Sequence, residues 1–464
     1  ANGDVPHVAM FDANQAFMWS FAIDEGMQTA MVVIEGNQNT FQTAFYATWS
    51  TGVKATVIKF SANGQIIWYK NFAVDAIEGL YEDANGNLYC SGYSNVAQSA
   101  LIFKLDPAGS IVWAKNINAN APYNFARGIE ESPDGNLVII GATSFNNVSN
   151  NQVTITKIDK QGNFVWGKIY ESTAKSIMAT GFAQSKQDNT FLMAGYCGSL
   201  ANVDNLDLFS MKFDTAGNHV NNKVLSYNWW DQYYSVAAIS DGGFVLTGLS
   251  KPVQTCGGNV VFVKMDNNND TTVVKVYGNP SGTGAIYTDI KYSNIKGITA
   301  FGTGSLFEST TFGADYQCLE LSPQLDLPCH FRQQNFNQST LPVSQVGNTS
   351  LSNRTINVSD TYTKLVDNLG AVDACTQQVL SVSDIENVIS MRLFPNPCST
   401  KLTVQLDENK SFDIKVYSIL GELITAKSAC KYEFELETSQ WKSGHYFIKI
   451  NTNKGQRTES FIVE

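Results

Sequence analysis

The sequence is poor in charged residues and has no long apolar run. Charged residues make up 16% of the 464 positions, whereas aromatic residues reach 12% and glycine occurs 35 times. This composition favours strands and tight turns over helices. No stretch of about 18 uninterrupted apolar residues occurs, which a membrane-spanning helix would need. We therefore expect an all-β protein without a transmembrane helix.

Positive charge is scarce as well, because the formal net charge is −11. Nucleic acids and anionic membrane surfaces bind basic patches, so neither is expected as a partner. The chain begins at Ala1 rather than Met, which is typical of a mature form whose signal peptide has been removed. We expect a monomer that acts outside the cytoplasm.

Motifs for common enzymatic chemistry are missing. Only four histidines occur, and no HExxH, GxSxG, P-loop or dinucleotide-binding pattern is present. The eight cysteines show no CxxC spacing, so no zinc site is expected. We predict no metal, no cofactor, no catalytic residue and no enzymatic activity. A glycan-active enzyme is the alternative, because paired carboxylates from distant strands would escape a motif search.

A repeat of about 50 residues dominates the first four fifths of the chain. A glycine in the second strand of each copy recurs at intervals of 49 to 54 residues, at Gly92, Gly141, Gly195, Gly248 and Gly302. A tryptophan marks the fourth strand at Trp68, Trp113 and Trp166, and we interpret these side chains as packing residues of the blades. Copies of this length with four short strands are typical of propeller blades. The pattern resembles NHL-like and quinoprotein-like β-propellers.

Hairpin turns explain the recurring acidic residues. Asp106, Asp159 and Asp214 each precede a glycine by three residues, so we interpret them as turn-capping residues rather than metal ligands. The hairpins predict a seven-bladed β-propeller over residues 1–375. We expect the N-terminal strands 8–23, with Trp19 in the place of the other tryptophans, to complete a last blade begun by residues 341–360. Such closure would remove exposed sheet edges.

The repeat ends in a linker at residues 376–390, and residues 391–464 have the alternating pattern of a small antiparallel β-sandwich. This segment resembles the type A C-terminal sorting domain of the Bacteroidetes type IX secretion system. The resemblance rests chiefly on Pro395, Asn396, Pro397, Gly421, Gly444 and Tyr446.

That resemblance implies export across the outer membrane to the cell surface or the extracellular space. It also implies three partners: the type IX translocon, an outer-membrane shuttle barrel, and a sortase that removes the domain within the linker. The alternative is a permanent sandwich module, for example one that binds carbohydrate.

An aromatic cluster, YNWWDQYY at 227–234, precedes the predicted innermost strand of one blade. Flat aromatic side chains suit sugar rings or peptide side chains. We predict a binding or adhesion module for a glycan or protein ligand. The alternatives are that these aromatic residues plug the central channel or pack between blades, or that the protein is an envelope-associated part without a small ligand. The candidate ligand-binding residues are Tyr123, Arg127, Tyr227, Trp229, Trp230, Tyr233, Tyr234 and Tyr287.

Two kinds of covalent modification are expected. Cys318 and Cys329 flank a predicted hairpin turn symmetrically, and Cys398 and Cys430 both lie in the terminal domain, so each pair is a disulfide candidate. Thr215 and Thr271 lie in Asp-Thr-Ala and Asp-Thr-Thr sequences that are similar to the O-glycosylation pattern of exported Bacteroidetes proteins.

Overall fold

The computed structural model divides the chain into two compact units, Ala1–Asp373 and Ala374–Glu464. It describes residues 7–11, 17–23, 28–47, 54–94, 98–119, 121–144, 151–185, 187–199, 205–226, 230–251, 258–277, 286–294, 297–303, 316–326, 337–359, 364–365, 391–406, 411–418, 422–431, 433–452 and 455–464.

Unit 1 is built from antiparallel sheets, which we number 1 to 7 along the chain. Sheet 1 holds β1 (His7–Phe11) and β2 (Phe17–Ile23). Sheets 2 and 3 hold β3 (Gln28–Glu35), β4 (Thr40–Ala47), β5 (Lys54–Ser61) and β6 (Ile66–Phe72), then β7 (Ala76–Glu82), β8 (Leu88–Ser94), β9 (Ser99–Leu105) and β10 (Ile111–Asn118). A single 3₁₀ turn in the described residues, η1 (Asn37–Asn39), joins β3 to β4.

The later sheets follow the same plan. Sheets 4 and 5 hold β11 (Tyr123–Glu131), β12 (Leu137–Ser144), β13 (Gln152–Ile158) and β14 (Phe164–Ser172), then β15 (Ser176–Gln184), β16 (Phe191–Gly198), β17 (Asp207–Phe213) and β18 (His219–Ser226). Sheets 6 and 7 hold β19 (Trp230–Ala238), β20 (Phe244–Lys251), β21 (Asn259–Met265) and β22 (Thr271–Tyr277), then β23 (Ile286–Ser293), β24 (Gly297–Thr303) and β25 (Tyr316–Leu321).

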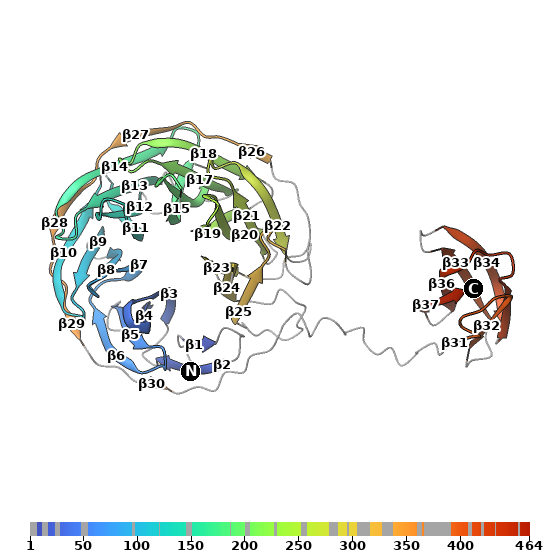
Figure 1. Cartoon of the computed structure of the whole chain (residues 1–464). Coiled ribbons are helices and arrows are strands. Elements are labelled where there is room, and N and C mark those ends of the chain that lie inside the picture. The colour runs from blue at the N-terminus through green and yellow to red at the C-terminus, as the bar shows by residue number, and fades with distance from the viewer. Residues whose placement is uncertain are drawn as a thin grey trace. The chain divides into compact units, whose positions relative to one another are not determined.

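The sheets stand around a ring, with the first strand of each four-stranded sheet at its inner rim (Figure 1). The expectation of an all-β, propeller-like unit is thereby confirmed. No helix among the described residues is long and apolar enough to span a membrane.

Tryptophans in the outer strands of sheets 1, 2 and 3 connect each of these sheets to the next. The indole nitrogens of Trp19, Trp68 and Trp113 donate to the carbonyls of Ala62, Pro107 and Lys160, at 2.8, 3.0 and 3.4 Å, in the turn between the third and fourth strands of the following sheet. Each ring also lies against the glycine of that turn. The interpretation of these tryptophans as packing residues between neighbouring sheets is confirmed.

The turn aspartates have the predicted capping role. Asp159 accepts hydrogen bonds from the backbone nitrogens of Gln161 and Asn163 at 2.9 and 2.8 Å, and Asp106 and Asp214 make equivalent bonds. Although partial burial opposes it, these hydrogen bonds hold the pKa of Asp159 below its ordinary value. No group of metal-binding side chains occurs among the described residues.

A belt of five short strands runs around the outside of the ring (Figure 1). It pairs with the outermost strands of sheets 5, 4, 3, 2 and 1 in that order, through β26 (Asn337–Ser339), β27 (Val343–Gly347), β28 (Ser350–Asn353), β29 (Val358–Ser359) and β30 (Lys364–Leu365).

Side chains hold the belt as well as backbone bonds. The hydroxyl groups of Thr349 and Thr156 are buried 2.7 Å apart, and the guanidinium of Arg354 donates to Asn116 and Ser99 at 2.9 and 3.1 Å. The belt is therefore an integral part of five sheets.

The belt corrects one prediction from the sequence. Residues 341–360 do not begin a blade that residues 8–23 complete, because β27 and β28 pair with β14 and β10 instead. The N-terminal hairpin of β1 and β2 pairs with β30, at residues 364–365. The physical reason is that belt strands of two to five residues add to existing sheet edges and do not need a hairpin partner of their own.

Unit 2 consists of two antiparallel sheets around one apolar core. One sheet holds β31 (Met391–Phe394), β32 (Lys401–Leu406) and β35 (Glu433–Glu437). The other holds β34 (Leu423–Lys431), β33 (Ser411–Ser418), β36 (Gly444–Thr452) and β37 (Gly455–Val463), in that order. Alternate residues, such as Ile414, Val416, Ile448 and Ile450, are buried, as the alternating sequence predicts.

The contact between tryptophan and turn glycine can be tested in sheet 4. Gly162 has φ +83°, and a Cβ there would lie 2.9 Å from the Trp113 ring, whereas a Cβ at Gly135, with φ +79°, would meet nothing closer than 3.8 Å. Both alanine substitutions impose left-handed strain of about 1–2 kcal/mol. We expect Gly162→Ala to lose about 1–3 kcal/mol more, because the ring must shift. Urea denaturation measures both, and equal losses would contradict the packing role.

Candidate functional site

The inner strands share an irregularity at one position. Each carries a β-bulge, an extra residue that interrupts its register with the second strand. Bulges re-aim side chains and are common beside functional sites. The bulge residues are Met31, Glu78, Arg127, Thr180, Tyr234 and Thr288.

The bulges explain the repeating glycines of the second strand. Gly141 lies opposite Ala126, just before the bulge, and a Cβ on Gly141 would lie 1.9 Å from the carbonyl oxygen of Phe125. The same carbonyl contact faces Gly92, Gly195 and Gly248, at 2.0, 1.8 and 2.3 Å. Only glycine leaves room for the neighbouring carbonyl at this distance. The glycines therefore recur along the sequence with the same period as the bulges.

Glu78 and Arg127 are the bulge residues of neighbouring sheets 3 and 4, and they form an ion pair. The carboxylate is nearly buried, at 6% exposure, and the guanidinium side chain is 28% exposed. Glu78 Oε2 and Arg127 Nε are buried without a hydrogen-bond partner among the described residues. Burial raises the pKa of Glu78 in spite of the positive charge and hydrogen bond of Arg127.

Aromatic side chains surround this ion pair. The guanidinium carbon of Arg127 lies 5.2 Å from the centroid of Phe125, and the Phe125 ring meets Tyr93 edge to face at 5.0 Å. Tyr196 in β16 is close enough for the charge of Arg127 to act on its hydroxyl, although burial still raises the pKa of Tyr196. The cluster therefore combines a partly exposed cation with apolar ring surfaces.

The same face continues along β19. Trp230, Gln232 and Tyr234 alternate with buried residues, and the Trp230 indole donates to Gln232 Oε1 at 3.0 Å. The ammonium of Lys251 lies 5.8 Å from the centroid of the Trp230 ring. Burial raises the pKa of Tyr234 despite its hydrogen bond with Gln232, and the hydroxyl of Tyr196 acts on it as well. We define the inner-rim site as Glu78, Tyr93, Phe125, Arg127, Tyr196, Trp230, Gln232 and Tyr234.

The structure brings some predicted ligand residues into this site and removes others. Arg127, Trp230 and Tyr234 belong to it, and Tyr123 is half-buried at the start of the strand that carries Arg127. Tyr233 and Tyr287 are fully buried in apolar clusters, so their assignment as ligand residues was wrong. They directly precede the bulge and therefore point to the opposite face of the strand. Tyr227 and Trp229 lie outside the described residues.

The sequence analysis missed Glu78, Tyr93 and Tyr196 as site residues. A signal was available, because the bulge residues Glu78, Arg127, Thr180, Tyr234 and Thr288 recur with the same period as the landmark glycines. Alternation from the start of β11 already places Arg127 on the same face as Phe125, and the bulge shifts the alternation only beyond it.

Cysteines give a mixed outcome. Cys398 is a buried, free cysteine. Its backbone forms an isolated β-bridge with Val463 in β37, at one edge of the four-stranded sheet, whereas Cys430 lies in β34 at the opposite edge. With strands about 4.8 Å apart, the predicted disulfide between them cannot form. Cys318 is exposed in β25 and Cys329 lies outside the described residues, so that pair stays a prediction. Burial raises the pKa values of Cys90 and Cys197, that of Cys197 to about 12, which suits inert core thiols.

The two glycosylation candidates differ in access. Thr215 is exposed in the turn between β17 and β18. The hydroxyl of Thr271 is buried and has no hydrogen-bond partner among the described residues. Thr215 is therefore the better acceptor of the two, and modification of either remains a prediction.

The sorting-motif residues have clear structural roles in unit 2. Asn396 Oδ1 accepts a hydrogen bond from the backbone nitrogen of Ile462 at 2.9 Å, which ties the Pro-Asn-Pro loop to the last strand. Tyr446 is buried, its hydroxyl donates to the carbonyl of Lys442 at 2.7 Å, and its ring lies against Trp441 and Phe461. Gly421 lies outside the described residues.

Residues 392–464 match a family model described as a secretion system C-terminal sorting domain. The end of the chain is thus an export signal. The particular route is the type IX secretion system, so the chain is a cargo of that system, exported to the cell surface or the extracellular space. Its sorting domain interacts with the secretion machinery.

Several solved structures are similar to the chain at low identity. PorZ, an essential surface component of the type IX secretion system of Porphyromonas gingivalis, is 11% identical with a TM-score of 0.39; the match covers 100% of this chain and 56% of PorZ, so the chain spans little more than half of that protein. The α-L-arabinofuranosidase Arb93A of Fusarium graminearum is 10% identical, with a TM-score of 0.41 and coverage of 69% and 99%. A glycosyl hydrolase of Bacteroides ovatus is 8% identical, with a TM-score of 0.29 and coverage of 67% and 88%. No curated protein gives a significant match.

The prediction that the chain is not an enzyme has to be corrected. Glycoside hydrolases recur among the similar structures, so the missing sequence motifs do not exclude that class. The reason is physical, because such enzymes act through carboxylate pairs whose separation is set by the fold and not by local spacing.

The protonation state of Glu78 can be tested by measuring stability against pH. A pKa raised above its ordinary value of 4.5 means that the folded state binds the proton more tightly than the unfolded state, so this contribution to stability is present at low pH and lost as the pH rises through the raised value. We expect the free energy of unfolding of the wild type to fall relative to that of Glu78→Gln as the pH rises from 4.5 through the raised pKa of Glu78.

Urea denaturation at each pH measures this difference, and Glu35→Gln, at an exposed carboxylate of β3, controls for the loss of one charge. The opposite trend, with Glu78→Gln losing stability relative to wild type as the pH rises, would show that the ion pair with Arg127 outweighs burial.

Proposed function

We propose that unit 1 is the functional part of an exported protein and that it binds a glycan at the inner-rim site. The observation that carries the proposal is the partly exposed guanidinium of Arg127, which is held by its ion pair with the nearly buried Glu78 and lies among partly exposed rings. The partly exposed guanidinium of Arg127 would donate to sugar hydroxyls, and the apolar face of a sugar ring would pack on Tyr234 or Phe125.

Several features support a single closed ring behind this site. Seven sheets stand around it, and Trp19 of sheet 1 contacts sheet 2 in the same way as Trp68 and Trp113 contact the sheets that follow them. We infer a seven-bladed propeller, with sheet 1 contributing the outer strands of a blade. The N-terminal strands 8–23 and the belt would both take part in its closure.

For unit 2 we propose the full sorting pathway. It would dock on an outer-membrane shuttle barrel, and a sortase would cut the linker at 376–390. Support comes from the match to a sorting domain and from the division of the chain at Asp373 and Ala374, close to the linker.

Glycan binding is tested on a glycan array with the full chain. Tyr234→Ala is expected to weaken binding about tenfold, because an aromatic contact with a ligand contributes about 1–1.5 kcal/mol. Tyr233→Phe is the matched control, since it changes the neighbouring buried ring and leaves the site intact. Equal binding by both variants, or no binding by the wild type to any glycan, would reject the proposal. Mass spectrometry of the eluted glycan distinguishes binding from cleavage.

Removal of the sorting domain is tested by mass spectrometry of extracellular protein from the native host. We expect peptides from residues 1–375 and none from residues 391–464, because the sortase cuts between them. A chain that ends at residue 390 is the control and is expected to stay inside the cell. Extracellular protein that retains residues 391–464 would contradict removal, while export itself would stand.

A further inference from the structure

In sheets 4 and 5, a lysine near the end of the third strand bridges to the next sheet. Lys157 in sheet 4 pairs with Asp134 at 2.7 Å and donates to Ser132 Oγ at 3.2 Å and to the carbonyl of Thr215, in sheet 5, at 3.3 Å. Lys212 in sheet 5 pairs with Asp188 at 2.9 Å and donates to the side chain of Asn267, in sheet 6, at 3.3 Å. Both lysine side chains are about 5% exposed or less.

Lys264 holds the equivalent position in sheet 6 but does not reach sheet 7. The equivalence follows from the register, in which Lys157, Lys212 and Lys264 oppose Trp166, Asn221 and Val273. Among the described residues, Asp241 is the one polar group that pairs with the Lys264 ammonium, at 3.3 Å. The Lys264 side chain is 21% exposed. An ammonium group has three donors, so two are left for another partner.

At two positions the residues of sheets 6 and 7 differ from those of the earlier sheets and leave space between the two sheets. Trp166 fills the space over the turn of the next sheet, and a Cβ on Gly217 would lie 2.5 Å from its ring; the shorter Val273 stands in its place in sheet 6. In the facing turn of sheet 7, Pro323 takes the position that Thr215 and Asn267 hold in sheets 5 and 6. That turn is capped by Ser322, whose hydroxyl accepts from the backbone nitrogens of Gln324 and Asp326.

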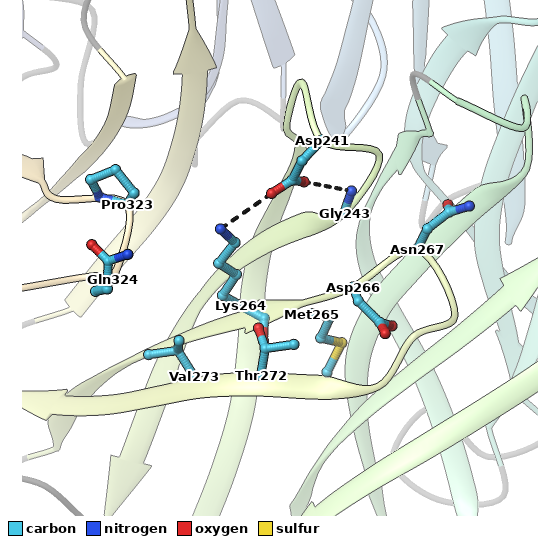
Figure 2. A pocket seen from close by; sticks show the side chains of 10 residues that line it. All are labelled: Asp241, Gly243, Lys264, Met265, Asp266, Asn267, Thr272, Val273, Pro323 and Gln324. Carbon is cyan, nitrogen blue, oxygen red and sulfur yellow. Dashed lines mark hydrogen bonds and ion pairs between the residues drawn. The ribbon is translucent and has the colours of Figure 1, made fainter.

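A pocket of about 400 Å³ results between sheets 6 and 7. Figure 2 shows Lys264 extended toward Asp241, with Pro323 and Gln324 across the space from them. Val273, Met265 and Pro323 supply apolar surface, while Asp241, Asp266, Gln324 and Thr272 supply polar groups. The volume is in the range of small-molecule sites.

We propose that this pocket binds a neutral, hydroxyl-rich ligand of one or two sugar rings. Donors on Lys264, acceptors on Asp241 and the amide of Gln324 match hydroxyl groups, which both donate and accept. The apolar face of a sugar ring fits against Val273 and Pro323. Two carboxylates, of Asp241 and Asp266, against one ammonium disfavour an anionic ligand.

The pocket lies beside the turn that joins β19 to β20 and the turns that follow β21 and β25, away from the bulges, and its residues are separate from those of the inner-rim site. It would therefore hold its ligand independently of the proposed function, and a variant of either site tests only that site.

The test is saturation-transfer NMR on the full chain with maltose, cellobiose and lactose as probes. We expect transfer to at least one probe, and Lys264→Met should weaken it about tenfold while keeping the alkyl stem. Lys104→Met is the matched control, because Lys104 is the equivalent lysine of sheet 3 and lies over the Tyr89 ring. Gln324→Leu removes an exposed amide at the pocket and is a second variant should Lys264→Met fail to fold.

No transfer to any of the three probes would overturn the proposal, and so would equal binding by wild type, Lys264→Met and Gln324→Leu. Tyr234→Ala should leave the signal unchanged, and its loss in that variant would assign the binding to the inner-rim site instead.

Discussion

The unpaired backbone at the outer edge of each sheet is the constraint on which unit 1 depends. A ring of antiparallel sheets brings the inner strands together, but it leaves the last strand of every sheet with free N–H and C=O groups that invite pairing with other chains. Here the belt strands β26 to β30 satisfy part of that edge on five sheets. Thr349 and Arg354 add side-chain bonds that fix which belt residue meets which sheet.

The inner rim faces a different constraint, because it must bring strands close and still present functional side chains. The bulges solve it by adding one residue to each inner strand, and glycines such as Gly141 give them room. Glu78 and Arg127 meet across two sheets because both are bulge residues at the same height. The inner-rim site is thus a direct product of the repeat, whereas the pocket at Lys264 arises where the repeat is broken.

Local patterns in the sequence were enough to predict the sheets, the capping role of Asp159 and the packing of Trp113, since each depends on neighbours within one copy or the next. The belt was not predictable in this way, because its short strands pair with partners about 110 to 340 residues distant and carry no copy of the repeat. Tyr233 was misplaced because residues 227–234 were expected to precede the strand, whereas residues 230–234 belong to β19 and alternate between partly exposed and buried positions. Motif searches, in turn, cannot measure distances between carboxylates on different sheets.

The belt also sets an order of events during synthesis. It visits sheets 5, 4, 3, 2 and 1 in the reverse of the order in which the ribosome makes them. Sheet 1 is synthesised first and stays longest without its belt strand, because β2 can pair with β30 only after residues 364–365 have been made. Until then the nascent ring has open outer edges, so a chaperone that covers strand edges would be needed most for the N-terminal hairpin.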